Sequence, residues 1–275
     1  MKLISKSVAA ALLIAGSALL VSQPAQAGVG DLLVAPTRII LDGGRGAEII
    51  LNNIGDEPAT YRISTEFRRM KEDGSLEDVA TPDDKDKETA DMIIYAPRRV
   101  TLAPREPQSI RIAARPPQGL PDGEYRVHLL FRAIPPATPV SKTDAPGSSG
   151  LSFKLTPVYG ITIPVIVRLG NLDVQSAISN VHLDKQDGKP EIALDLSRSG
   201  NRSTYGEVRV YKAGVKEPIA VQRGVAIYTE LSHRSVEIPV ADAYQGDLSG
   251  PVTVEYVETF IDGTKTLAQT QAVLR

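Results

Sequence analysis

The 275-residue sequence contains no cysteine and no tryptophan, and only 5% of its residues are aromatic. Without cysteine, thiol catalysis, thiolate metal sites and disulfide bonds are excluded, so the folded chain depends on its hydrophobic cores. Scarce aromatic residues argue against the recognition of nucleic-acid bases by stacking. The formal net charge of −2 provides no basic field that would attract nucleic acid or an anionic membrane.

The sequence also offers few candidate catalytic residues. Its three histidines are scattered and share no metal-binding spacing. It contains neither a Gly-x-Ser-x-Gly nucleophile motif nor a Gly-x-x-x-x-Gly-Lys phosphate loop. We therefore expect no enzyme, no metal and no cofactor. One enzymatic alternative is a glycosidase that uses two carboxylates far apart in the chain, with Glu66, Glu124 and Glu255 as candidates.

The first 27 residues have the features of a secretory signal peptide. Lys2 and Lys6 precede an apolar stretch at residues 8–21, and small residues follow at 25–27. We expect cleavage after Ala27, with an uncleaved anchor as the alternative. No later apolar run approaches membrane length, so we expect no membrane insertion of the mature chain.

Hydrophobic residues recur at every second position through much of the remaining chain. Residues 61–67, 125–131 and 192–196 show this spacing, which is typical of half-buried β-strands. Turn sequences such as Pro121-Asp122-Gly123 separate the runs. Many short strands with regular turns predict an all-β fold built from antiparallel β-sandwiches.

A candidate domain boundary lies at residues 169–171, where a long strand ends and a fresh set of strands begins. It divides the chain after the signal peptide into residues 28–169 and 170–275, each of ordinary domain size. Residues 71–89 are charged and poor in hydrophobic residues, and we expect a long loop there. Within it, we expect residues 83–88 to be solvated, with a cation site as the alternative. We expect no amphipathic helix longer than two turns anywhere in the chain.

Five segments of the first domain carry a family resemblance. They include Thr37-Arg38 before an apolar run, the Pro-rich stretch that begins at Tyr95-Ala96-Pro97, and residues 120–136. In order and spacing, they resemble the periplasmic chaperones of the chaperone–usher pilus pathway. The resemblance covers about residues 31–170, and the second domain matches only in length and β character.

The resemblance implies two immunoglobulin-like domains joined by a short hinge, with a cleft between them, in the periplasm. It also implies partners: pilus subunits that lack one strand of their sandwich, and an outer-membrane usher. The chaperone would lend its own strand to the subunit, which is a known mode of β-augmentation. Self-association of the free chaperone is a further possibility. The alternative is a periplasmic structural or adhesin-type sandwich protein that donates no strand.

The resemblance places the donated strand at about residues 149–168. Alternation selects Leu151, Phe153, Leu155 and Tyr159 as the side chains that would enter the subunit. The alternative is that these side chains belong to the core of the chain itself. Two prolines within the stretch favour that alternative, because proline removes a ladder hydrogen bond.

The resemblance also implies a basic anchor for the C-terminal carboxylate of the subunit. Arg38 matches the first of two expected cations, and a guanidinium can grip a carboxylate through parallel hydrogen bonds. The second cation, usually a lysine, is missing before Arg168. Three alternatives follow: Arg38 works with a hydroxyl such as that of Thr162, another cation supplies the charge, or anchoring differs.

A third set of residues resembles the family's interdomain salt bridge. Arg168 matches the bridging arginine and Glu124 matches one of its two acids. The second acid should come from the second domain, where Asp247 is our choice and Asp242 the alternative. We expect these residues to hold the angle between the domains.

Overall fold

The structure is a computed structural model that describes residues 31–135, 158–260 and 263–275. The expected signal peptide lies outside the described residues, and so do Leu151, Phe153 and Leu155. Described residues are mostly in β-strands, with one short α-helix. No helix in these ranges is long and apolar enough to cross a membrane.

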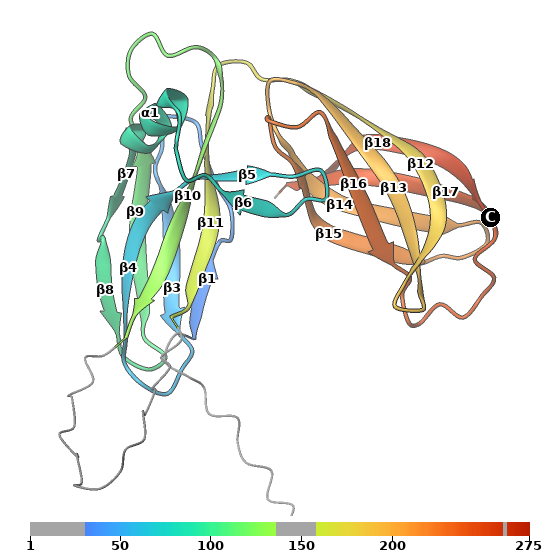
Figure 1. The fold of residues 1–275 in the computed structure, drawn as a ribbon, viewed down its shortest axis with the longest axis horizontal. Coiled ribbons are helices and arrows are strands. Elements are labelled where there is room, and N and C mark those ends of the chain that lie inside the picture. The colour runs from blue at the N-terminus through green and yellow to red at the C-terminus, as the bar shows by residue number, and fades with distance from the viewer. Residues whose placement is uncertain (1–30, 136–157, 261–262) are drawn as a thin grey trace, which may run out of the picture.

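The first domain is a sandwich of two sheets (Figure 1). One sheet has the order β1-β3-β9-β7 and the other β2-β11-β10-β4-β8. The strands are β1 (Leu32–Ala35), β2 (Ile39–Leu41), β3 (Ala47–Asn53), β4 (Ala59–Glu66), β7 (Ile93–Ala96), β8 (Arg99–Leu102), β9 (Pro107–Ala114), β10 (Gly123–Ile134) and β11 (Gly160–Leu169). Alternate residues such as Ile49, Leu51, Ile110 and Leu129 are fully buried between the sheets.

The second domain is a smaller sandwich of a three-stranded sheet, β12-β13-β16, and a four-stranded sheet, β15-β14-β17-β18. Its strands are β12 (Val174–Gln186), β13 (Lys189–Gly200), β14 (Thr204–Lys212), β15 (Ala220–Ile227), β16 (His233–Pro239), β17 (Gly250–Phe260) and β18 (Gly263–Leu274). Ile192, Val208, Val254 and Tyr256 are completely buried in its core. The expectation of an all-β fold with two sandwich domains is therefore confirmed.

The turn between the domains requires a glycine. Strand β11 ends at Leu169, and Gly170 has φ +74°, a left-handed conformation that residues with a side chain rarely adopt. A Cβ atom on Gly170 would lie 1.9 Å from the carboxylate carbon of Asp122. The chain therefore turns here without room for a side chain.

The expectation of a long loop at residues 71–89 is wrong. This region contains β6 (Leu76–Asp78), which pairs with β5 (Arg68–Met70), and the nine-residue helix α1 (Asp84–Met92). A reciprocal pair of hydrogen bonds between Asp83 and Asp86 caps the helix. Asp86 is buried and accepts two hydrogen bonds of 2.8 Å from Arg69. Capping and this distant arginine stabilise a helix that has no strong apolar face.

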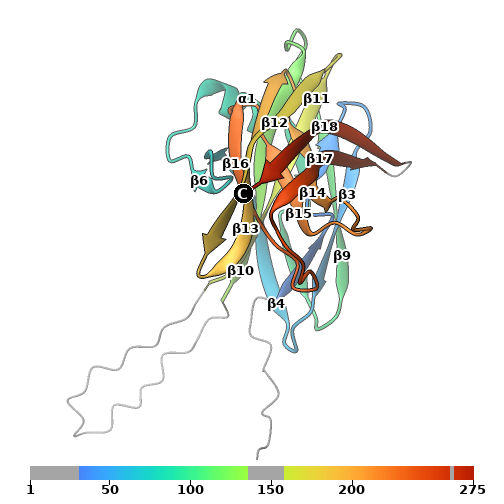
Figure 2. The same ribbon diagram turned by 90° about the vertical axis from the view of Figure 1, so that its right-hand side faces the viewer.

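The β5–β6 hairpin leaves the first sandwich and reaches the second (Figures 1 and 2). Near its tip, the carbonyl of Glu72 accepts a hydrogen bond of 2.9 Å from the Ser235 N–H on β16. Gly74 has φ +81° and packs so closely on Arg234 that a Cβ atom would lie 2.1 Å from its Nη2. We call this hairpin the interdomain arm.

Candidate functional site

Strand β11 has one covered edge and one partly open edge. Along its whole length it pairs with β10. On the other side, β2 pairs with it only at Val165–Val167. Among the residues that the structure describes, no strand pairs with this side of β11 between Gly160 and Pro164. Five consecutive residues therefore have an edge that could accept another strand.

Arg38 lies where this open edge begins. Strands β2 and β11 are parallel, with Ile39 opposite Val165. The preceding residue, Arg38, is therefore level with Pro164 along the sheet. A strand added to the open edge would meet Arg38 at one of its ends.

The second domain supplies the hydrogen-bond partner and the aromatic neighbours of the Arg38 side chain. Its Nη2 donates a hydrogen bond of 3.2 Å to the Ser203 hydroxyl. The guanidinium carbon lies 4.6 Å from the ring centre of Tyr205 and 5.6 Å from that of Tyr228. Burial lowers the pKa of Arg38, while Tyr228 and Glu124 act in the opposite direction.

Two donors of Arg38 remain unsatisfied. Its Nε and Nη1 atoms are buried and have no hydrogen-bond partner among the described residues. A buried donor without a partner costs free energy, and a bound carboxylate would remove that cost. Of the two neighbouring rings, Tyr205 is 38% exposed and borders solvent, whereas Tyr228 is buried.

Glu124 and Arg168 meet, as their family resemblance implies. Arg168 Nε donates to Glu124 Oε2 at 3.0 Å, and the Ser203 N–H donates to the same oxygen at 3.0 Å. Arg168 Nη2 also donates to the Ser203 carbonyl at 3.2 Å. The second-domain partner is therefore the backbone of Ser203, not an acid. Asp247 lies exposed in a loop and accepts hydrogen bonds from Ser249.

The structure does not bring Thr162 to Arg38. The Thr162 hydroxyl donates to Glu66 Oε1 at 2.6 Å, and Arg68 Nε donates to the same oxygen at 2.7 Å. Tyr159, just before β11, is 59% exposed. It is the one donor-strand candidate within the described residues.

A second interdomain contact was not evident from the sequence. Arg126 on β10 donates to both carboxylate oxygens of Glu230, at 3.0 and 2.5 Å. Its guanidinium carbon lies 3.6 Å from the ring centre of Tyr228. Glu230 also accepts a hydrogen bond of 2.9 Å from the Met70 N–H on the interdomain arm. Alternation in β10 indicates that Arg126 points away from the first core, but only the fold shows what covers it.

Apolar residues complete this contact. Met70, Ile166, Ala226 and Tyr228 form a small buried cluster that is separate from both sandwich cores. Next to it, His128 is 1% exposed and its ring stands edge-on to Tyr228, with centres 6.5 Å apart. Burial, together with nearby Arg126, lowers the pKa of His128 to about 3. The imidazole is therefore neutral at physiological pH.

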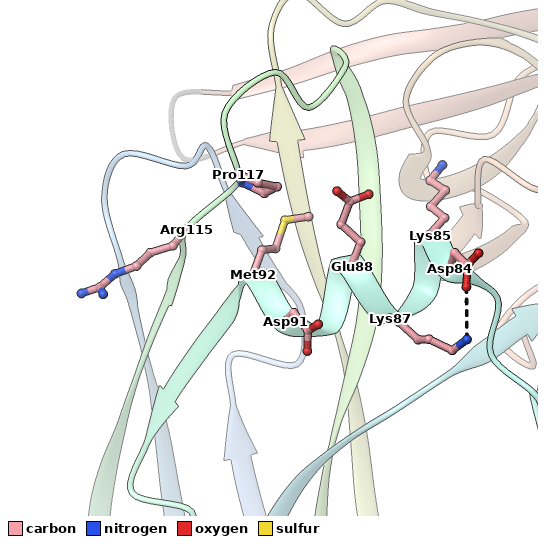
Figure 3. Close-up of a pocket in the computed structure, with 8 residues that line it drawn as sticks. All are labelled: Asp84, Lys85, Lys87, Glu88, Asp91, Met92, Arg115 and Pro117. Atoms are coloured by element: carbon pink, nitrogen blue, oxygen red, sulfur yellow. Dashed lines mark hydrogen bonds and ion pairs between the residues drawn. The ribbon is translucent and has the colours of Figure 1, made fainter.

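One hollow lies beside these residues and another lies in the first domain. A cavity of about 200 Å³ lies between the domains, lined on one side by Arg69, Glu124 and Arg126, and on the other by Thr229 and Glu230. A larger, open hollow of about 670 Å³ runs along α1 (Figure 3). Its lining carries side chains of both signs, so its charge selects neither anions nor cations.

The described residues offer no obvious catalytic centre. None of their His, Asp and Glu residues form a group of three that could hold a metal ion. The glutamates considered for a glycosidase are each engaged elsewhere: Glu66 with Arg68, Glu124 with Arg168, and Glu255 with the side-chain amide of Gln269.

No protein-family model and no curated protein matches this chain. Similar solved structures include the YadV chaperone, at 14% identity and a TM-score of 0.45, covering 89% of this chain and 100% of that one. The E. coli chaperone DraB is 15% identical, with a TM-score of 0.43 and coverage of 90% of this chain and 98% of that one. The Pseudomonas aeruginosa CupB2 chaperone is 12% identical, with a TM-score of 0.44 and coverage of 88% of this chain and 100% of that one.

Proposed function

We propose that this chain is a periplasmic chaperone of the chaperone–usher pathway, which binds pilus subunits by donor-strand complementation and delivers them to an outer-membrane usher. One observation carries the proposal: among the described residues, the unpaired edge of β11 begins level with Arg38, and the Nε and Nη1 atoms of Arg38 have no hydrogen-bond partner. An edge strand and a basic anchor at its end are the two elements that such a chaperone needs.

The proposed complex has a simple physical basis. A subunit that lacks one strand exposes an open sheet edge and a gap in its core, and both promote aggregation. The edge at Gly160–Pro164 and the residues before it would satisfy the backbone of the subunit, and alternate side chains would fill its core. The C-terminal carboxylate of the subunit would displace Tyr205 and bind Arg38, which fixes the register of the added strand.

The function needs no catalytic group and no cofactor. Binding alone holds the subunit, and replacement by a strand from the next subunit at the usher would release it. The charged residues between the domains then have a structural task, because they set the distance between Arg38 and the second domain.

The test is production of the chain together with each small secreted β-sandwich protein encoded beside its gene. We expect a soluble one-to-one complex with at least one of them. Arg38→Ala should weaken the complex roughly ten- to a hundredfold, because a hydrogen-bonded charge is lost. Arg62→Ala is the control, since Arg62 is exposed on β4, away from the β11 edge.

The dissociation constant of each variant is measured by titration calorimetry. Equal affinities for the Arg38 variant and the wild type would remove Arg38 from the site. If none of the neighbouring secreted proteins forms a complex, a structural or adhesin-type role becomes the better explanation.

A further inference from the structure

Arg38 belongs to the first domain, but its hydrogen bond and its two ring contacts come from the second. Ser203 accepts its hydrogen bond, and the rings of Tyr205 and Tyr228 lie over its guanidinium. Of the two rings, Tyr228 is 5% exposed and Tyr205 is 38% exposed. Tyr205 is the nearer ring, at 4.6 Å against 5.6 Å, and Tyr228 is the ring that is buried.

Tyr228 is itself held in place by the first domain. The Arg126 guanidinium lies 3.6 Å from its ring centre, and two hydrogen bonds to Glu230 fix that arginine. Met70 and Ile166 pack on the same cluster, so the ring contacts both the interdomain arm and strand β11. The two arginine cations thus contact the same buried ring. The cation–π attraction is stronger at such a desolvated site than at the protein surface.

We propose that Tyr228 is a positioning residue that holds the Arg38 guanidinium level with the open edge of β11. The proposal rests on the proposed function, in which Arg38 binds the carboxylate of a subunit. It assigns the second domain a direct part in binding, although the donated strand belongs to the first. The Arg38 guanidinium would be positioned to bind a carboxylate only while the Tyr228 ring is packed between the domains.

The tyrosine hydroxyl is not needed for this task, because no hydrogen bond from it is present among the described residues. Tyr228→Phe keeps the ring and should behave as the wild type. Tyr228→Leu removes the ring but keeps an apolar side chain. Because Tyr228 belongs to neither sandwich core, both domains should stay folded in either variant. Circular dichroism spectra of the two variants check this expectation.

The first measurement needs no ligand. Hydrogen exchange of the Arg38 Nε–H, followed by NMR on the free protein, reports how firmly the side chain is held. We expect at least tenfold faster exchange in Tyr228→Leu and no change in Tyr228→Phe. Unchanged exchange in Tyr228→Leu would overturn the proposal, whatever the fate of the proposed function.

The second measurement is a double-mutant cycle with the co-purified subunit as the probe. Tyr228→Leu should raise the dissociation constant about tenfold, which corresponds to about 1.4 kcal/mol. In an Arg38→Ala background it should have no further effect, because the ring acts through that arginine. An equal cost in both backgrounds would assign Tyr228 a merely structural role. If Arg38→Ala alone has no effect, Arg38 is not part of the binding site, and if no subunit binds at all, the proposed function fails. In both cases the exchange measurement still decides whether Tyr228 holds Arg38 in place.

Discussion

At the scale of single residues, the interface between the domains depends on charged groups that serve two partners. Glu124 Oε2 accepts from Arg168 Nε and from the Ser203 N–H, so one buried oxygen joins both domains. Glu230 similarly joins Arg126 to the backbone of Met70. Buried charges are tolerated when they are paired and hydrogen-bonded. Removal of one partner leaves the other charge buried and unpaired, which destabilises the folded state.

His128 should make the stability of the protein sensitive to pH. Its pKa is about 3 in the folded state, against 6.5 when exposed. Between these values the unfolded chain binds a proton that the folded one does not, so stability should fall as pH drops from 6.5 toward 3. The groups that face His128 are Arg126, Arg68, Glu230 and Arg38, together with the Tyr228 ring.

The measurement is urea unfolding at pH 7, 6 and 5. In this range His128 should contribute a loss of up to about 1.4 kcal/mol per pH unit. His128→Leu should reduce the slope, while the replacement of exposed His182 by leucine serves as the control for the loss of one histidine. The same slope in His128→Leu and the wild type would show that this buried imidazole does not determine the acid response.

At the scale of elements, β11 combines two tasks along one strand. Ile163, Val165 and Val167 are buried in the first core, while Ile166 faces the interdomain cluster. This second half is held on both edges by β10 and β2. Among the described residues, no strand pairs with the outer edge of the first half. The strand is thus anchored in its own sheet while this edge is available for the proposed partner strand.

The residues before β11 carry the prediction for the donated strand. Phe153→Asp should weaken the subunit complex at least tenfold, because burial of Phe is worth roughly 1.5–3 kcal/mol and a buried unpaired charge adds a cost. Ser152→Asp introduces the same charge on the opposite face of the expected strand and should bind nearly as the wild type. The dissociation constants are compared by calorimetry. Equal losses in the two variants would argue against insertion of alternate side chains.

At the scale of the whole molecule, the domains are connected at more places than the hinge. Glu124, Arg168 and Ser203 join them near Gly170, and the interdomain arm joins them through Met70. Two separated contacts resist rotation about the hinge better than one. We therefore expect the angle between the domains to depend on the arm.

Met70→Asp tests this expectation, because it places an unpaired charge in the interdomain cluster while leaving both sandwich cores intact. Small-angle X-ray scattering should show a larger radius of gyration and a broader distribution of distances. Lys71→Asp, at the next and exposed position of the arm, should scatter as the wild type does. A Met70 variant that scatters as the wild type does would show that the hinge contact alone sets the angle.

The region around α1 shows where sequence patterns were not sufficient. The sequence predicts a loop at residues 83–88, because these residues are charged and apolar residues do not recur among them at helical spacing. The helix forms because Asp83 and Asp86 cap each other, and because Arg69, far away in the sequence, pairs with the buried Asp86. Capping is a local signal that could have been recognised, whereas the pairing with Arg69 is not local.

Much of the fold was determined by the sequence alone, because alternation of period two and regular turns depend only on neighbouring residues. The pairing of Arg168 with Glu124 was accessible through the family resemblance. Only the tertiary structure decided the rest: that Ser203 takes the place expected for Asp247, that Thr162 bonds to Glu66, and that Tyr228 lies beside two arginines. These contacts join residues from separate strands and domains, and no local pattern in the chain encodes which of them meet.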